Sequence, residues 1–154
     1  MATKNRTLKV VCYNMHGFNQ GCPTIDELIH SHNPDIFLLQ EHWLTPANLY
    51  KFDNHFVDYL AFGSSAMSSL VEAGMLTGRP YGGVMILVTK SLRKFMRSVA
   101  CSDRYVIVKV GSYLLANVYL PCVGSADRQL LCEDILNEIW SWRVHFPYCY
   151  SRRL

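Results

Sequence analysis

The chain has 154 residues, of which 50% are hydrophobic and 18% charged, so a disordered protein is excluded and one globular domain over residues 1–154 is predicted. Its net charge of +3 permits a polyanionic partner without requiring one. The longest apolar run, Val84 to Val88, is too short to cross a bilayer, so we expect no membrane partner.

The six cysteines contain no C-x-x-C pair, so the usual zinc spacing is missing. The first residues, Met1 to Arg6, are polar and basic rather than a secretory leader. We therefore expect reduced, mostly buried cysteines in an intracellular protein, with a nuclear or cytoplasmic location left open.

The first predicted strand spans Leu8 to Asn14 and is rich in β-branched and aromatic residues. A loop with two glycines follows it. The capping-box sequence Thr24-Ile25-Asp26-Glu27, directly after Pro23, predicts a helix that ends at Asn33-Pro34.

The next apolar run, Ile36 to Leu39, predicts a strand covered on both faces, and it ends in Gln40-Glu41. Strand, helix and strand in succession form a unit whose two strands lie parallel. The carboxyl ends of these strands then lie at one sheet edge, which brings Asn14 and Glu41 together. The alternative is that Glu41 only marks where the strand meets water.

Beyond Glu41, Thr45 and Pro46 predict the start of a helix whose apolar stripe includes Phe52. A short strand over 58–63 and a long loop over 64–81, with one helical turn, follow. At the end of that loop, Arg79 and Tyr81 precede two glycines and can contact a phosphate and a base or sugar. An ordinary glycine-rich entry into a strand is the alternative.

Four further strands are predicted over 84–89, 95–100, 105–110 and 113–120. Alternation within 105–110 indicates a sheet with one wetter face, and Gly111-Ser112 predicts a two-residue hairpin turn. The hairpin is antiparallel whereas the first unit is parallel, so the sheets are mixed.

A long amphipathic helix is predicted from its N-cap at Ser125. Its apolar positions recur at helical spacing, and their aromatic content indicates core packing. They are Leu131, Ile135, Ile139, Trp142 and Phe146.

Four short motifs occur in this order along the chain: Tyr13-Asn14-Met15-His16-Gly17, Leu39-Gln40-Glu41, Tyr81-Gly82-Gly83-Val84 and Asn117-Val118-Tyr119-Leu120-Pro121. Together they resemble the N-terminal part of the endonuclease/exonuclease/phosphatase superfamily, which has the deoxyribonuclease I-like fold. Within it, the chain is most similar to the apurinic-type endonuclease domain of non-LTR (LINE-like) retrotransposons. The resemblance implies an α+β sandwich of two packed mixed β-sheets flanked by helices, here C-terminally truncated.

The resemblance also implies a Mg²⁺-dependent phosphodiester hydrolase, with Mn²⁺ as a possible substitute and DNA as partner. By position, Asn14 and Glu41 would be metal-site and catalytic residues, and Tyr119 would be the active-site tyrosine. Asn117 lies two residues before Tyr119 on the same strand, so it shares that face and is expected to bind substrate. Mg²⁺ prefers oxygen ligands and is often held by one or two carboxylates, which suits Glu41 beside an amide.

Two later motifs of the superfamily, Asp-x-Asn and Ser-Asp-His, do not occur in this chain. They would supply the catalytic base, so we expect this chain alone to be an inactive or weak nuclease. None of the six histidines matches a catalytic position. A sheet short of strands would expose an apolar face to a partner or to self-association. The alternatives are a non-catalytic interaction module and a phosphatase relative acting on phosphoinositides or sphingolipids.

Overall fold

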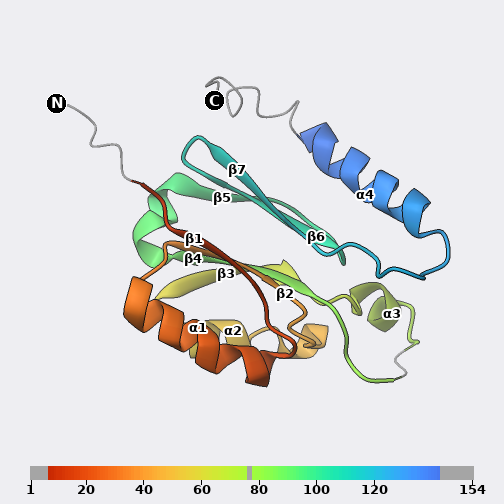
Figure 1. Ribbon diagram of the computed structural model, residues 1–154, viewed down its shortest axis with the longest axis horizontal. Coiled ribbons are helices and arrows are strands. Elements are labelled where there is room, and N and C mark those ends of the chain that lie inside the picture. The colour runs from red at the N-terminus through yellow and green to blue at the C-terminus, as the bar shows by residue number, and fades with distance from the viewer. Residues whose placement is uncertain (1–6, 76–77, 143–154) are drawn as a thin grey trace.

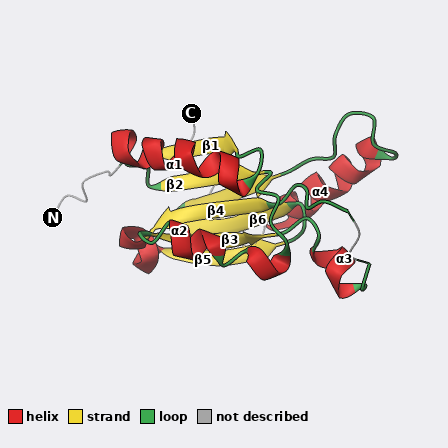
Figure 2. Cartoon of the chain, turned by 90° about the horizontal axis from the view of Figure 1, so that it is seen from below, coloured by secondary structure: helices red, strands yellow, loops and turns green. Residues whose placement is uncertain are grey.

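The computed structural model describes residues 7–75 and 78–142 (Figure 1). Two β-sheets pack face to face, with helices α1 and α2 outside one sheet and α4 on the side of the other (Figures 1 and 2). This is the mixed sandwich that the motifs predicted.

The larger sheet has four strands in the order β1-β2-β4-β3. β1 pairs parallel with β2, as predicted, whereas β4 runs antiparallel to both of its neighbours. The strands are β1 (Val10–Asn14), β2 (Ile36–Gln40), β3 (Tyr59–Ser64) and β4 (Val84–Thr89).

The core has two layers because the side chains of the central strands alternate between two covered faces. On β4, Val84, Ile86 and Val88 face the second sheet, whereas Met85 and Leu87 face the helices. β2 alternates in the same way, so the prediction that it is covered on both faces is confirmed. A carboxylate directly after such a strand is held by a rigid support.

Helix α1 (Phe18–His32) begins before Pro23 rather than after it, so the capping-box prediction was wrong. Phe18, Cys22 and Ile25 are buried against the larger sheet, and this packing outweighs the hydrogen bond that proline cannot make. The predicted end is confirmed, because Asn33 caps the helix in the left-handed conformation.

Three short helical segments follow in the region predicted as a helix and a loop. The helix expected after Thr45 is split into a 3-10 turn, η1 (Pro46–Asn48), and α2 (Lys51–His55). The single helical turn expected in the long loop is α3 (Ser68–Glu72).

The smaller sheet is an antiparallel meander in the order β5-β6-β7. A 3-10 segment, η2 (Lys90–Phe95), leads into β5 (Met96–Cys101), and β6 (Tyr105–Val110) and β7 (Tyr113–Val118) are joined at the predicted two-residue turn.

The wetter face expected for β6 is not observed at Tyr105 and Ile107, which are 3% and 0% exposed. Helix α4 (Arg128–Trp142) lies on this side, and the Tyr105 hydroxyl donates a hydrogen bond to Glu138 at 2.6 Å (Figure 1). The apolar face expected to stay open is therefore closed at these two residues.

Helix α4 begins at Arg128, three residues after the expected N-cap Ser125. Its apolar stripe is only half-buried in the described residues, and Phe146 lies outside them. The expectation of mostly buried cysteines was also wrong, because only Cys22 is buried among the five described cysteines. The described helices include none with the length and apolarity that a bilayer crossing requires.

Candidate active site at the strand ends

Asn14 and Glu41 lie at the carboxyl ends of adjacent parallel strands. Asn14 is in register with Gln40, and Glu41 is the next residue. Two backbone hydrogen bonds continue the pairing past the strands, from Met15 N–H to Gln40 O and from Gly17 N–H to Glu41 O, both 2.8 Å. The predicted juxtaposition therefore rests on a continuous backbone ladder.

The backbone around Glu41 is strained. Glu41, His16 and Trp43 have φ values of 55°, 52° and 54°, in the left-handed region that residues other than glycine rarely adopt. Such residues cost about 1–3 kcal/mol each and persist where surrounding contacts enforce them. The backbone conformation of Glu41 is held from both sides, because its N–H donates to Gly83 O at 2.9 Å and its carbonyl accepts from Gly17 N–H.

His16 connects the two strand ends, and sequence reasoning did not single it out. Its N–H donates to Asn14 Oδ1 at 3.0 Å, while its ring Nδ1 lies 3.9 Å from Glu41 Oε2. The His16 side chain is 73% exposed and that of Glu41 is 21% exposed. The carboxylate is thus accessible from solvent, beside an imidazole and a fixed amide oxygen.

Tyr119 directly follows β7, on the smaller sheet. Burial raises the pKa of its hydroxyl to about 12, helped by hydrogen bonding to Cys122 and by the negative charge of Glu41. Tyr119 and Glu41 are therefore electrostatic neighbours, although they come from different sheets. At neutral pH the phenol keeps its proton and can donate a hydrogen bond.

Contacts of its ring and backbone hold Tyr119 in place. A Cβ on Gly82 would lie 3.2 Å from Tyr119 Cε1, so a glycine allows this loop to approach the ring. The Arg104 guanidinium lies 5.7 Å from the ring centroid, and Tyr119 N–H donates to Arg104 O at 2.8 Å. Arg104 was not recognised from sequence, because no motif contains it.

Asn117 is 2% exposed and ties the two sheets together beneath the site. Its amide nitrogen donates to Leu39 O at 2.8 Å and to Met85 O at 2.9 Å, and its oxygen accepts a hydrogen bond from Gln40. An amide engaged in this way is suited to fixing the ends of β2 and β4, rather than to contacting a substrate.

His42 clamps the segment that carries Glu41. Its ring is 0% exposed, and its nitrogens accept the Leu44 N–H at 3.0 Å and contact Ser64 O at 3.0 Å. Burial lowers the pKa of the imidazole to about 4, so it is neutral at physiological pH. Gly83 lies so close to the imidazole that a Cβ at this position would be 2.3 Å from the ring.

Arg79 and Tyr81 lie on the exposed loop that leads into β4. The loop reaches the site through Gly82 and Gly83, whose carbonyls accept from Trp43 at 3.0 Å and Glu41 at 2.9 Å. Tyr81 is 45% exposed, and the described contacts bring neither side chain to Glu41. Their expected substrate contacts stay a prediction.

The donor set suits a hard cation that keeps several waters. In the described part of the chain, no three His, Cys, Asp or Glu side chains cluster as metal ligands. Glu41 supplies one accessible carboxylate, and Asn14 Oδ1 has a second lone pair beyond the one used by His16. One carboxylate with an amide oxygen is a donor set that Mg²⁺ accepts.

Comparison with known protein families identifies the family of this chain. A model of the endonuclease/exonuclease/phosphatase family matches residues 11–153. The chain belongs to this family. No curated protein matches the chain.

Solved structures share the fold at low sequence identity. A 3′-5′ exonuclease (NExo) from Neisseria meningitidis is 15% identical with a TM-score of 0.62, over 90% of this chain and 54% of that one. An AP endonuclease from Archaeoglobus fulgidus is 16% identical with a TM-score of 0.59, over 89% and 51%. D. rerio TDP2, complexed with single-strand DNA product, is 19% identical with a TM-score of 0.54, over 86% and 54%. This chain therefore spans about half the length of these structures.

Proposed function

We propose that the chain carries the metal-binding half of a Mg²⁺-dependent DNA endonuclease site, in a domain of the LINE-like retrotransposon type. The observation that carries this proposal is the convergence of Glu41 and Asn14, at the ends of adjacent strands of the larger sheet, with Tyr119 from the smaller sheet. An AP endonuclease structure and a TDP2 structure with bound single-strand DNA product share the fold, which supports DNA as the substrate class.

Each side chain has a distinct chemical role. Glu41 supplies the anionic oxygen, Asn14 supplies a neutral oxygen fixed by His16, and the protonated Tyr119 donates to a phosphate oxygen. A Mg²⁺ ion held by Glu41 and Asn14 would supply Lewis-acid chemistry, namely polarisation of a phosphoryl oxygen and stabilisation of charge on the leaving oxygen. Asn117 and His42 are positioning residues, since both act through the backbone that carries Glu41.

We propose that hydrolysis by this chain alone is weak. A general base is worth about 10²–10⁴-fold in rate, and the two motifs that would provide it and its orienting partner are missing from these 154 residues. A phosphatase acting on phosphoinositides would use the same metal-binding residues, so only substrate assays separate that alternative.

Metal binding provides the test, because it does not depend on turnover. Mn²⁺ affinity of wild type, Glu41→Gln and Glu27→Gln would be measured by electron paramagnetic resonance. Glu27 is an exposed glutamate on α1 and serves as the matched control. We expect Glu41→Gln to weaken Mn²⁺ binding more than about tenfold, since even second-shell partners are worth 10- to 100-fold. Equal affinity in the two variants would refute the metal site.

Supercoiled plasmid with Mg²⁺ tests the activity separately. We expect slow nicking at most. Robust nicking that Glu41→Gln abolishes would confirm the site and refute the proposed weakness. Robust nicking that survives Glu41→Gln would show that another site carries the chemistry.

A second proposal is that the chain associates with a partner or with itself, as a non-catalytic interaction module would. Leu130, Leu136 and Trp140 on α4 are 59%, 50% and 53% exposed, and large exposed apolar side chains on one helix favour a partner. Light scattering over a concentration series tests self-association, and a monomer at all concentrations would refute it.

A further inference from the structure

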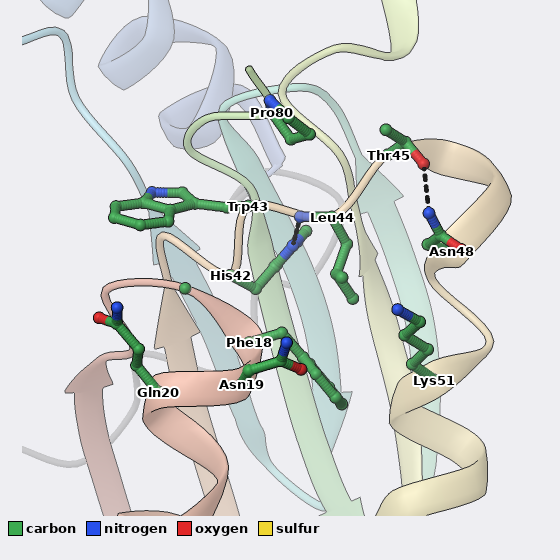
Figure 3. Close-up of a pocket in the computed structure, with 11 residues that line it drawn as sticks. Phe18, Asn19, Gln20, His42, Trp43, Leu44, Thr45, Asn48, Lys51 and Pro80 are labelled. Atoms are coloured by element: carbon green, nitrogen blue, oxygen red, sulfur yellow. Dashed lines mark hydrogen bonds between the residues drawn. The ribbon is translucent and has the colours of Figure 1, made fainter.

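A pocket of about 340 Å³ opens beside the candidate active site (Figure 3). It lies between the start of α1, the segment after β2 and the start of α2. The lining residues that matter here are Phe18, Asn19, Trp43, Asn48, Lys51 and Pro80. None of the motifs that led to the candidate active site predicted this pocket.

The pocket and the active site share a wall. Trp43 lies two residues after Glu41, so their Cα atoms are within about 7 Å. The ring of Trp43 lies against His16, with centroids 4.8 Å apart at 55°, and a Cβ on Gly17 would lie 2.9 Å from Trp43 Cε3. A DNA strand that runs from the candidate metal site toward the pocket would meet Trp43 first.

The walls combine one cation with amides and aromatic rings. Among the described residues that line the pocket, none is acidic and Lys51 carries the single positive charge. Asn19 and Asn48 add amide groups that can donate or accept hydrogen bonds. The His42 imidazole also lines the pocket, but its ring nitrogens contact Leu44 N–H and Ser64 O.

The pocket is also held in shape. Thr45 Oγ1 accepts a hydrogen bond from Asn48 at 3.0 Å, and Phe18 packs edge-on against Phe52 with centroids 4.9 Å apart. Figure 3 shows Trp43 and Lys51 at opposite ends of the pocket. A ligand that satisfies both ends therefore carries a flat ring and an anionic group.

We propose that this pocket holds one nucleotide of a DNA strand, next to the scissile phosphate, with its phosphate at Lys51 and its base at Trp43. The volume is at the lower end of ligand pockets and suits one nucleotide rather than several. An inositol phosphate fits less well, because it has no flat ring and its several phosphates would face one lysine. The position beside the scissile phosphate rests on the proposed function, whereas the nucleotide site does not.

Binding of a fluorescent single-stranded oligonucleotide to the 154-residue chain tests the proposal. Anisotropy would be measured in EDTA, so that the result is independent of metal binding and hydrolysis. The pocket variants are Lys51→Ala and Trp43→Ala, and the matched controls are Lys90→Ala and Tyr113→Ala. Both control residues are exposed and lie outside the pocket, on η2 and β7. Thermal unfolding of each variant, with Trp43→Phe as a milder change, separates loss of binding from loss of fold.

We expect each pocket variant to weaken binding about fivefold or more, and the controls to stay within about twofold. Lys51→Ala should also reduce the slope of log K against log salt by about 0.7, the value for one phosphate contact on a single strand. Lys51→Arg should restore both. Equal effects in pocket and control variants would overturn the proposal.

Two competitors identify the ligand class. A deoxynucleoside 5′-monophosphate should displace the oligonucleotide from wild type more effectively than inositol trisphosphate, and the reverse order would overturn the nucleotide assignment. If the Mn²⁺ test fails while the Lys51 and Trp43 effects persist, the pocket is a nucleotide site without the hydrolytic role. If Mn²⁺ binds through Glu41 and the pocket variants bind DNA normally, only the pocket proposal fails.

Discussion

Replacing Asn117 with alanine removes the polar link between the two sheets directly beneath the candidate site. Its amide makes hydrogen bonds of 2.8 and 2.9 Å to the carbonyls of Leu39 and Met85 and accepts one from Gln40. Each is worth about 1 kcal/mol net, and loss of a partner leaves buried groups unsatisfied. We therefore expect Asn117→Ala to lower the free energy of unfolding by about 3 kcal/mol, which corresponds to about 6–12 °C in Tm for a domain of this size.

Urea denaturation followed by tryptophan fluorescence measures this loss. Asn137→Ala, at an exposed position on α4, is the matched control and should change stability little. Asn117→Asp should cost more than alanine, because it places a carboxylate opposite two carbonyl oxygens. A loss below about 1 kcal/mol for Asn117→Ala would show that these hydrogen bonds do not hold the strand ends.

Three further predictions concern stability. Gly83→Ala should lower the free energy of unfolding by more than about 2 kcal/mol, because its Cβ would lie 2.3 Å from the His42 ring. Gly78→Ala is the control, since Gly78 has a similar φ but open space around it. Equal losses of stability in the two variants would refute the clash. In the unfolded state His42 takes up a proton below its ordinary pKa of 6.5, whereas in the folded state its pKa is about 4. The free energy of unfolding should therefore fall by about 2 kcal/mol from pH 7 to pH 5. His42→Gln should flatten that acid slope in urea titrations, and an unchanged slope would contradict the assignment. Burial, aided by Asp26, raises the pKa of Cys22 from 9.0 to about 12, so stability should fall by about 1 kcal/mol from pH 7 to 10. Cys22→Ala should remove this alkaline loss, and a loss of the same size in the variant would contradict it.

Much of the fold was predictable where local pattern and tertiary packing agree. The parallel pair β1 and β2, the doubly covered β2 and the two-residue turn at Gly111 all follow from short sequence patterns. The start of α1 was not predictable in this way, because burial of Phe18 and Cys22 overrides a capping box and a proline.

The candidate site shows the same division. Asn14 and Glu41 were predicted together because two parallel strand ends share an edge. His16 could not be identified from the sequence, because its role depends on a strained loop. The pocket at Lys51 and Trp43 could not be predicted either, because it depends on how separate loops pack.

The amino-acid sequence by itself determined the family, the order of the strands along the chain and the two polar residues at their ends, because these depend on neighbours close in the chain. Only the tertiary structure decided that Asn117 lies beneath the site, that α4 closes over Tyr105, and that Trp43 lines a pocket beside the candidate metal site. The physical reason is that each of these contacts joins segments far apart in sequence, whose approach is set by packing rather than by local pattern.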